Sequence, residues 1–319
     1  MNYETVAKLA KRHSRGTRIA GILFIAAVIA VAVGIGSTMK YMIWVGLGLL
    51  AATIGFAAVF VDPTEKKFRD AYEEKYLFPV CKKYFGGSFR FDRQGGFDKA
   101  DVKGMGLVQL GRFTTLNMLS GKYGGRAFKS AYLVIKQRHS KTAGKKADVK
   151  VINDAQVMRF EDSSLNAPDV MIRPKGAFDT EGLMLKMKRP YKLAENIGTE
   201  AFQRRFEVLA QSYDGLAEFF DEERCAALLD YRSMVRATSR YSSVFVHYNG
   251  NAADVIINNW ANKTMPSTSL PFTDSQYRRF AEDVTDIIRG FVDMGRRPLC
   301  DRAEDETAVE ADYIETAKK

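Results

Sequence analysis

Residues suited to acid–base or metal chemistry are few and far apart in this chain of 319 residues. The histidines are His13, His139 and His247, and they form neither an HExxH motif nor a pair four residues apart. A zinc site needs three or four nearby ligands, so the sequence offers poor support for a metal. His247 lies beside Tyr248 in a β-like run, where a half-buried strand histidine explains it more simply than a catalytic one. We therefore expect no metal and no cofactor.

Motifs for nucleophilic and phosphate chemistry do not occur either. The sequence contains no GxSxG, no Walker A loop and no dinucleotide-binding fingerprint. The acidic run 221–223 fits the start of a helix, where carboxylates stabilise the unpaired backbone amides. We assign no catalytic residue. An enzyme whose active site is assembled from distant residues needs no local motif and is kept as an alternative.

The stretch 122–150 is distinguished by its charge. It contains nine basic residues against one acid, Asp148. The basic residues are Lys122, Arg126, Lys129, Lys136, Arg138, Lys141, Lys145, Lys146 and Lys150. The simplest interpretation is a solvated hairpin whose lysines keep a strand edge from aggregating. A second is contact with anionic lipid headgroups, to which each base contributes about 1 kcal/mol. Nucleic acid ranks a distant third, because few aromatic side chains are placed to stack on bases.

Two apolar runs near the N-terminus are candidate membrane spans, relative to which the rest of the chain is placed. Ile19–Gly36 and Tyr41–Val61 contain no charged residue and are separated by a short polar break. As helices of about 18 to 21 residues they reach about 27–32 Å, roughly the hydrocarbon thickness of a bilayer. We predict a two-helix transmembrane hairpin. Gly48, Ala52 and Gly55 share one face of the second helix, and we expect the two helices to pack on each other there.

The charges beside these runs predict the orientation of the hairpin. Residues 1–18 carry five bases against one acid, Lys40 is the one charge in the linker, and three bases follow within 66–69. Flanks rich in Lys and Arg stay cytoplasmic, so both termini are expected in the cytoplasm. Widely spaced cysteines without a CxxC pair fit reduced thiols in that compartment. These cysteines are Cys81, Cys225 and Cys300.

The chain after the hairpin predicts an α+β domain. Asp62-Pro63-Thr64-Glu65 fits a helix start with a capping box, followed by a kink near Pro79. Further helices are expected over 222–234 and from Thr273 to about Gly295, the last also with a capping box. Apolar and β-branched runs separated by turn residues predict antiparallel strands flanked by these helices. The runs are 106–116, 124–138, 146–161, 168–174, the end of 201–210, and 241–248 paired with 253–257 around Asn249-Gly250-Asn251. The segment 181–191 is expected to add another strand or an irregular crossing.

The expected organisation has four parts. They are a basic cytoplasmic N-terminus (1–18), the transmembrane hairpin (19–61), a cytoplasmic α+β domain (62–297) and an acidic disordered tail (298–319). The tail carries seven acids against three bases and few large apolar residues, which is typical of disorder.

Three segments together resemble a known family. They are KFRDAYEEKYLFPV, SGKYGGRAFKSAYLVI (Ser120–Ile135) and EAFQRRFEVLAQSYDGLAEFFDEERCAALLD (Glu200–Asp230). With the preceding hairpin, this order is similar to the bacterial DUF3137 family of membrane-anchored proteins, over roughly Thr64–Arg297. The resemblance implies a bacterial inner-membrane setting and a fold. It implies no catalytic residue, because the shared motifs are turns and packing positions.

The sequence therefore favours a membrane-anchored binding or scaffolding module with an unknown ligand. The 122–150 segment is its candidate site for anionic lipid headgroups, and other membrane proteins are candidate partners. Two alternatives stay open. One is a membrane-tethered, hydrolase-like enzyme with a dispersed active site, and the other is an accessory subunit of a membrane complex.

Overall fold

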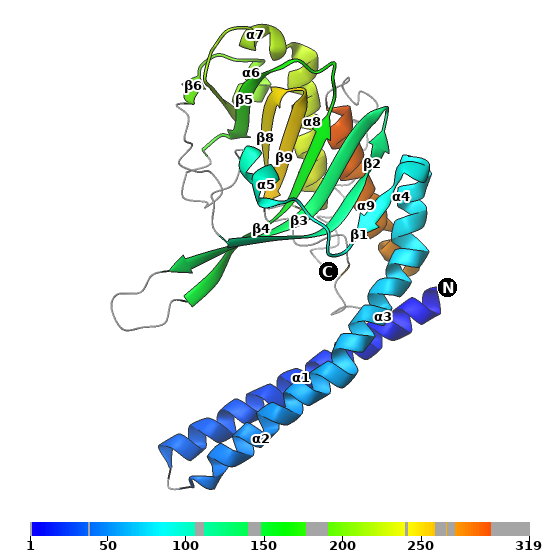
Figure 1. Ribbon diagram of the computed structural model, residues 1–319, viewed down its shortest axis with the longest axis vertical. Helices are drawn as coiled ribbons and strands as arrows, with labels where there is room; N and C mark the ends of the chain where they lie inside the picture. The colour runs from blue at the N-terminus through cyan, green and yellow to red at the C-terminus, as the bar shows by residue number, and fades with distance from the viewer. Residues whose placement is uncertain are drawn as a thin grey trace, which may run out of the picture. The chain divides into compact units, whose positions relative to one another are not determined.

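The computed structural model describes residues 2–37, 39–105, 112–139, 148–176, 191–239, 242–258, 266 and 272–294. Figure 1 labels the elements along the chain. The helices are α1 (Tyr3–Gly36), α2 (Tyr41–Phe56), η1 (Ala57–Val61), α3 (Asp62–Tyr72), η2 (Glu73–Leu77), α4 (Phe78–Phe85), η3 (Gly86–Ser88), α5 (Lys99–Gly104), α6 (Glu200–Gln203), α7 (Leu216–Phe219), α8 (Glu222–Thr238) and α9 (Asp274–Asp293). The strands are β1 (Arg90–Asp92), β2 (Arg112–Tyr123), β3 (Arg126–His139), β4 (Asp148–Glu161), β5 (Ala167–Pro174), β6 (Lys192–Ala194), β7 (Phe206–Ala210), β8 (Ser243–Gly250) and β9 (Ala252–Asn258).

The predicted α+β class is confirmed for the described residues. An N-terminal pair of apolar helices precedes one large antiparallel sheet with its helices. The chain forms two compact units. We call Met1–Lys83 with Lys263–Val284 the helical unit, and Tyr84–Asn262 with Thr285–Lys319 the sheet unit. Residues 181–190 of the segment predicted as a strand or an irregular crossing, and the predicted disordered tail 298–319, lie outside the described residues.

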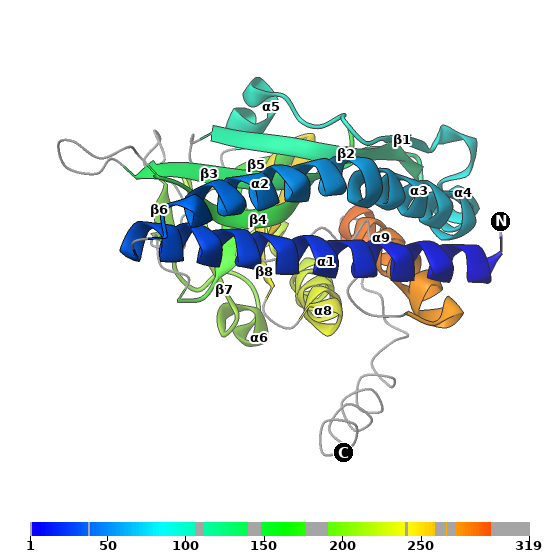
Figure 2. The same cartoon turned by 90° about the horizontal axis from the view of Figure 1, so that it is seen from below.

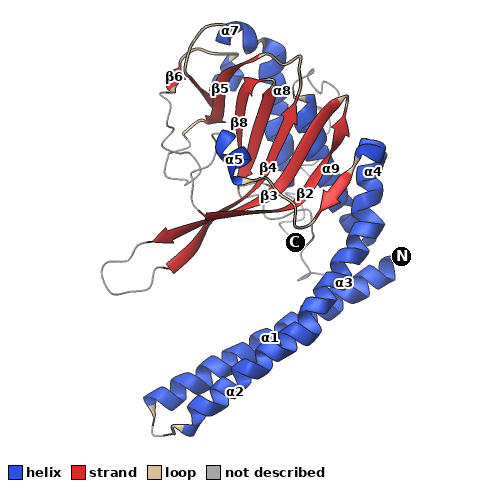
Figure 3. Ribbon diagram, viewed as in Figure 1, coloured by secondary structure: helices blue, strands red, loops and turns tan. Residues whose placement is uncertain are grey.

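Two of the described helices are long and apolar enough to cross a membrane. They are the helix Tyr3–Gly36 and a continuous helix over Tyr41–Ser88, and α1 and α2 run side by side in Figure 3. Their backbones meet at glycines. A Cβ added to Gly46 would lie 2.5 Å from Cγ2 of Val31 and 2.8 Å from the carbonyl oxygen of Ala27. Only glycine fits that approach.

The small-residue face expected to join the two helices is not the one that does so. A Cβ added to Gly48 or Gly55 meets nothing within 4 Å, and Ala52 is exposed. Gly46 and Gly34 carry the close contact instead. Positions 46 and 48 lie about 200° apart around a helix, so the two glycines face opposite sides.

The predicted helix start at Asp62 is wrong, because the helix passes through it. Proline at position 63 has no N–H and cannot bond the carbonyl four residues earlier. The π-helical turn η1 precedes it, in which the Asp62 N–H donates to the Ala57 carbonyl. Pro79 is preceded in the same way by η2, where the Phe78 N–H donates to the Glu73 carbonyl. Each widened turn lets the helix continue past a proline that would otherwise end it.

The sheet unit contains a sheet of nine strands in the order β1-β2-β3-β4-β9-β8-β5-β7-β6. Every neighbouring pair is antiparallel, as predicted. The hairpin predicted around Asn249-Gly250-Asn251 is confirmed, because Asn249 pairs with Ala252 and Gly250 has a positive φ of 59°. Strand β2 extends beyond its predicted end at Leu116, to Tyr123, and the short β1 pairs with it.

Helix caps read from the sequence are present in the structure. Asp221 accepts a hydrogen bond from the Arg224 N–H at 2.7 Å and starts α8. At the start of α9, Thr273 Oγ1 accepts from the Gln276 N–H at 3.2 Å, and Gln276 Oε1 accepts from the Thr273 N–H at 2.8 Å. This reciprocal pair is the predicted capping box.

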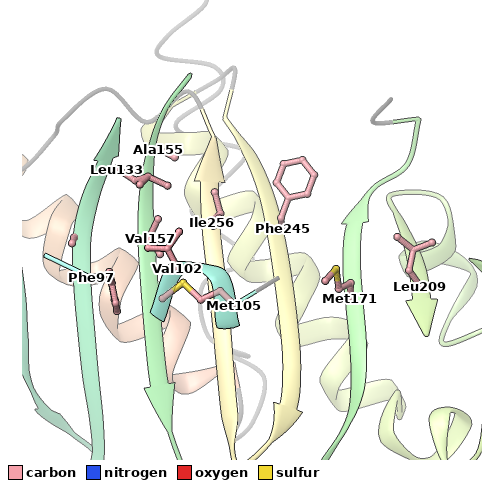
Figure 4. Close-up of a cluster of buried hydrophobic side chains, with 11 residues drawn as sticks. Phe97, Val102, Met105, Leu133, Ala155, Val157, Met171, Leu209, Phe245 and Ile256 are labelled. Carbon is pink, nitrogen blue, oxygen red and sulfur yellow. The ribbon is translucent and has the colours of Figure 1, made fainter. Parts of the chain in front are cut away.

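The two faces of the sheet are covered differently. Helix α8 and the Thr285–Asp293 part of α9 lie on one face, where the Phe160 and Phe291 rings are 4.8 Å apart (Figure 2). The short α5 lies on the other face, which we call the α5 face. Figure 4 shows its apolar cluster. The cluster contains Phe97, Val102, Met105, Ala131, Leu133, Ala155, Val157, Met171, Leu209, Phe245 and Ile256.

Candidate functional site

Among the described residues, the β3–β4 hairpin extends beyond the rest of the sheet (Figure 1). Within the described residues, the pairing of β2 with β3 reaches Lys136, and the pairing of β9 with β4 reaches Ala155. Beyond these points, Gln137–His139 pair with Asp148–Lys150 of β4. We call residues 136–150 the basic arm. It carries six bases against one acid in the sequence, so it holds most of the charge of the 122–150 segment.

The structure describes six of the nine predicted anion-binding residues. Lys136, Arg138 and Lys150 lie on the paired strands of the basic arm. Lys141, Lys145 and Lys146 lie outside the described residues. Lys122 and Lys129 are exposed on the parts of β2 and β3 that belong to the main sheet. The ninth residue is Arg126.

Arg126 has partners inside the sheet unit. Its guanidinium forms an ion pair with Asp162 and donates a hydrogen bond to the carbonyl oxygen of Val292 at 2.8 Å. Burial acts to raise the pKa of Asp162, but hydrogen bonds from Ser164 and the charge of Arg126 outweigh it, and the pKa is lowered. Arg126 therefore holds β3 to the chain after β4 and to α9, and its part in anion binding stays a prediction.

A second candidate site is a row of charged and polar side chains on the α5 face. Register places Arg159 on β4 opposite Asp254 on β9, and Asp254 opposite His247 on β8. The Arg159 guanidinium donates to Asp254 twice, from Nε at 2.7 Å and from Nη2 at 2.9 Å. Asp101 of α5 lies 3.9 Å from Nη1 of the same guanidinium. Along this row, the guanidinium of Arg159 therefore lies between the carboxyl groups of Asp101 and Asp254.

Burial makes the Asp254–Arg159 pair interdependent. Only 4% of the Asp254 side chain is exposed, against 21% for Arg159. Burial raises the pKa of Asp254, although the hydrogen bonds and charge of Arg159 oppose the rise. The hydrogen bond to Asp254 in turn raises the pKa of Arg159. A buried carboxylate is tolerated in a protein interior when it is paired in this way.

His247 is the central residue of the row. It lies in mid-strand, as predicted, but is buried rather than half-buried, with 4% of its side chain exposed. Nδ1 lies 2.7 Å from the carbonyl oxygen of Met105, and Nε2 lies 2.9 Å from Oδ1 of Asp169. Both ring nitrogens are therefore engaged, and neither is left to accept a proton from a substrate.

Asp169 forms hydrogen bonds with the remaining members of the row. Its Oδ1 accepts a hydrogen bond from the Tyr191 hydroxyl, and its Oδ2 accepts one from Nε2 of Gln211 at 2.9 Å. A β-bulge lies at this point, because the register between β5 and β8 shifts between Ala167 and Val170. Bulges change the direction of a side chain. This bulge accompanies the contact between Asp169 and His247.

Sequence reasoning singled out His247 but missed its partners. Asp169, Tyr191 and Gln211 come from three segments, and only the strand pairing brings them together. One sequence pattern pointed to the row. Asp254 interrupts the apolar run 252–257, in a strand whose side chains are buried on both faces. A charge at such a position needs a partner.

Metal chemistry finds no support in the part of the chain that is described. No group of three or more His, Cys, Asp or Glu is placed there to hold an ion. Cys81 and Cys225 are free and buried. Burial raises the pKa of the Cys81 thiol to about 12, and burial also raises that of Cys225, so both are poor nucleophiles.

Searches against protein-family models, curated proteins and solved structures found no match to this chain. The resemblance to the DUF3137 family therefore rests on the residue patterns described above, and function is argued from the residues of this chain.

Proposed function

We propose that this chain is a membrane-anchored binding module whose basic arm contacts anionic lipid headgroups. Its apolar helices serve as the anchor, and the sheet unit is the cytoplasmic part. We also propose a bacterial inner-membrane setting, as in the DUF3137 family that the chain resembles. The observation that carries the proposal is the extension of a strongly basic hairpin beyond the sheet of a protein with two membrane-length apolar helices.

Exposure of the apolar helices supports an anchor over a soluble core. Sixteen of the nineteen exposed large hydrophobic residues among the described residues lie between Ile19 and Phe60. Trp44 is 74% exposed and Ile22 is 67% exposed. A core helix of a soluble protein would bury such side chains, whereas a lipid environment accepts them.

The anchor favours lipid over nucleic acid as the partner of the basic arm. A chain held at a bilayer meets lipid headgroups at high effective concentration, and basic residues near an anionic leaflet are each worth about 1 kcal/mol. Residues 136–150 contain no Phe, Tyr or Trp on which a base could stack.

Vesicle flotation tests the proposal with the full chain. The protein is embedded in nanodiscs of phosphatidylcholine and mixed with vesicles of phosphatidylcholine alone or with an equal amount of phosphatidylglycerol. We expect flotation with the anionic vesicles only. Lys141→Gln, Lys145→Gln and Lys146→Gln together should weaken binding about a hundredfold, because about 3 kcal/mol is lost.

The matched control removes three bases elsewhere in the sheet unit. Lys99, Lys192 and Arg205 are exposed outside the basic arm, and their joint replacement by Gln makes the same change in net charge. This control should bind as the wild type does. Equal binding to both kinds of vesicle overturns the proposal, as does equal weakening by the two triple variants. Preferential binding of an RNA duplex over anionic vesicles would assign the basic arm to nucleic acid instead.

A further inference from the structure

The hydrogen-bond partners of His247 define how many protons its ring carries. Nδ1 faces the carbonyl oxygen of Met105 at 2.7 Å. A carbonyl oxygen accepts hydrogen bonds and donates none, so Nδ1 carries a hydrogen. In a neutral imidazole the second nitrogen is then a bare acceptor.

The second nitrogen, Nε2, also faces an acceptor. Oδ1 of Asp169 lies 2.9 Å away, and the Asp169 carboxyl already accepts from Tyr191 and Gln211. Donors on both of its oxygens stabilise the carboxylate form of Asp169. A bare Nε2 would place its lone pair against that carboxylate. A hydrogen on Nε2 converts the contact into a charge-assisted hydrogen bond.

Carboxyl groups on three neighbouring elements favour a cation at this position. Asp169 comes from β5 and Asp254 from β9, while Asp101 comes from α5. The positive partner within the row is Arg159 of β4, which is bound to Asp254 and near Asp101. Among the described residues, the row therefore holds three carboxyl groups against one guanidinium before His247 is counted.

We propose that His247 is an imidazolium with hydrogens on both ring nitrogens, and that its Nε2 proton is a buried link between β8 and Asp169. Loss of this proton to water leaves the Nδ1–H bond to Met105 in place. It removes the bond to Asp169, which holds Tyr191, just before β6, and Gln211, just after β7. The β5-β7-β6 end of the sheet is paired with β8 through the backbone of β5, and the His247–Asp169 contact adds a side-chain link that depends on one proton.

Histidine labelling of the full chain tests the proposal. The protein contains three histidines, so labelling them with ¹³C and ¹⁵N gives three ring spectra, and His247→Gln identifies the signal of His247. At neutral pH we expect both ring nitrogens of His247 to show an attached hydrogen. A His247 ring with one unprotonated nitrogen overturns the proposal.

The variant Asp169→Asn tests whether the carboxylate of Asp169 is what keeps a proton on Nε2 of His247. The Asn amide can donate to a bare Nε2, so this variant should fold with His247 in the neutral form that keeps its hydrogen on Nδ1. Asp214→Asn removes an exposed carboxylate from the segment after β7 and should leave the His247 spectrum unchanged. A doubly protonated ring in Asp169→Asn would contradict the assigned role of Asp169.

Hydrogen exchange supplies a readout that does not depend on the spectra. His247→Gln should speed exchange of the Val102 and Met105 amides about tenfold, the effect of losing one buried hydrogen bond to the segment after α5. Asp169→Asn keeps the Nδ1 bond and should leave these amides unchanged. Equal acceleration in both variants would show that the Nδ1 contact with Met105 is lost together with the Nε2 contact with Asp169, which contradicts the proposal.

Discussion

At the scale of single residues, the ionised form of Asp254 depends on one guanidinium. Burial raises the pKa of this carboxyl, and the hydrogen bonds and charge of Arg159 limit the rise. The folded protein therefore holds a proton on Asp254 at pH values where the unfolded chain has released it. By linkage, Asp254 costs stability as the pH rises from its ordinary pKa, 3.8, to its raised folded value, and the cost is constant above that.

Arg159→Met should expose this dependence. The variant leaves a buried carboxylate without its partner, and we expect a loss of about 3 kcal/mol at neutral pH. Because the pKa of Asp254 rises further, the deficit should be smaller at pH 5 than at pH 7. This loss of stability is measured by heating the protein with a thiol-reactive dye, which reaches the buried Cys225 on unfolding. The other cysteines are replaced in this background, as Cys81→Ser and Cys300→Ser.

The double variant Arg159→Met, Asp254→Asn is the control for this prediction. It removes both charges, so the difference between pH 5 and pH 7 should disappear and much of the stability should return. A deficit in Arg159→Met that is the same at both pH values would show that lost packing, not the stranded carboxylate, is responsible.

At the scale of elements, the two long helices are joined at particular turns. Gly46 allows close approach to α1, whereas Gly48 on the opposite side meets nothing within 4 Å. The same pair of helices continues past the apolar stretch, where His13 of α1 lies 3.7 Å from Glu65 of α3. The contact between the helices is therefore set by a few positions that allow no larger side chain.

Gly46→Ala and Gly48→Ala form a matched pair that tests this packing. The added methyl group is the same, but at position 46 it overlaps Val31 and the backbone of Ala27. We expect Gly46→Ala to lower the thermal stability of the helical unit, by about 1–3 kcal/mol for overpacking. The unfolding temperature of the helical unit is measured by binding of the dye to the buried Cys81, with the other two cysteines replaced by Ser. A larger effect of Gly48→Ala would place the contact on the other face.

At the scale of the whole molecule, the proposed anchor divides the chain between two sides of a membrane. Five bases precede the first apolar run, and the linker between the runs has one charge, Lys40. The positive-inside rule then predicts that the linker lies outside and that both ends of the hairpin lie in the cytoplasm.

Cysteine labelling in intact cells tests the orientation. In a chain with its own cysteines replaced by Ser, Met39→Cys reports the linker and Asn2→Cys reports the N-terminus. We expect a membrane-impermeant maleimide to label position 39 in intact cells and position 2 only after permeabilisation. The reverse pattern would contradict the proposed orientation, and labelling of both positions in intact cells would contradict the anchor.

Much of the fold was predictable because it depends on local patterns. The caps at Asp221 and Thr273, the turn at Gly250 and the alternating strands each need only a few neighbouring residues. The start at Asp62 was predicted wrongly because a capping pattern and a π-helical turn share the same proline. Which of two small-residue faces joins the helices depends on their rotation, which spacing alone does not determine.

The candidate site was predictable only in part. Charge marked the basic arm, because a run of lysines is visible without any structure. The row around His247 was not visible in this way, since Asp101, Arg159, Asp169 and Asp254 are spread over 150 residues and meet through strand order. Nothing in a single segment indicates that β5 will lie beside β8.

The strand order has a consequence for how the sheet is made during synthesis. Strands β4 and β5 are consecutive in the chain, yet the hairpin β9-β8 lies between them. Of the described strands, the two central ones are thus the last to leave the ribosome, and β4 and β5 keep open edges until about 80 further residues have been added. Chaperones that cover unpaired strands would matter most in that interval. The join of β4 to β9 should be the slow step in folding, because it closes the longest loop in the sheet.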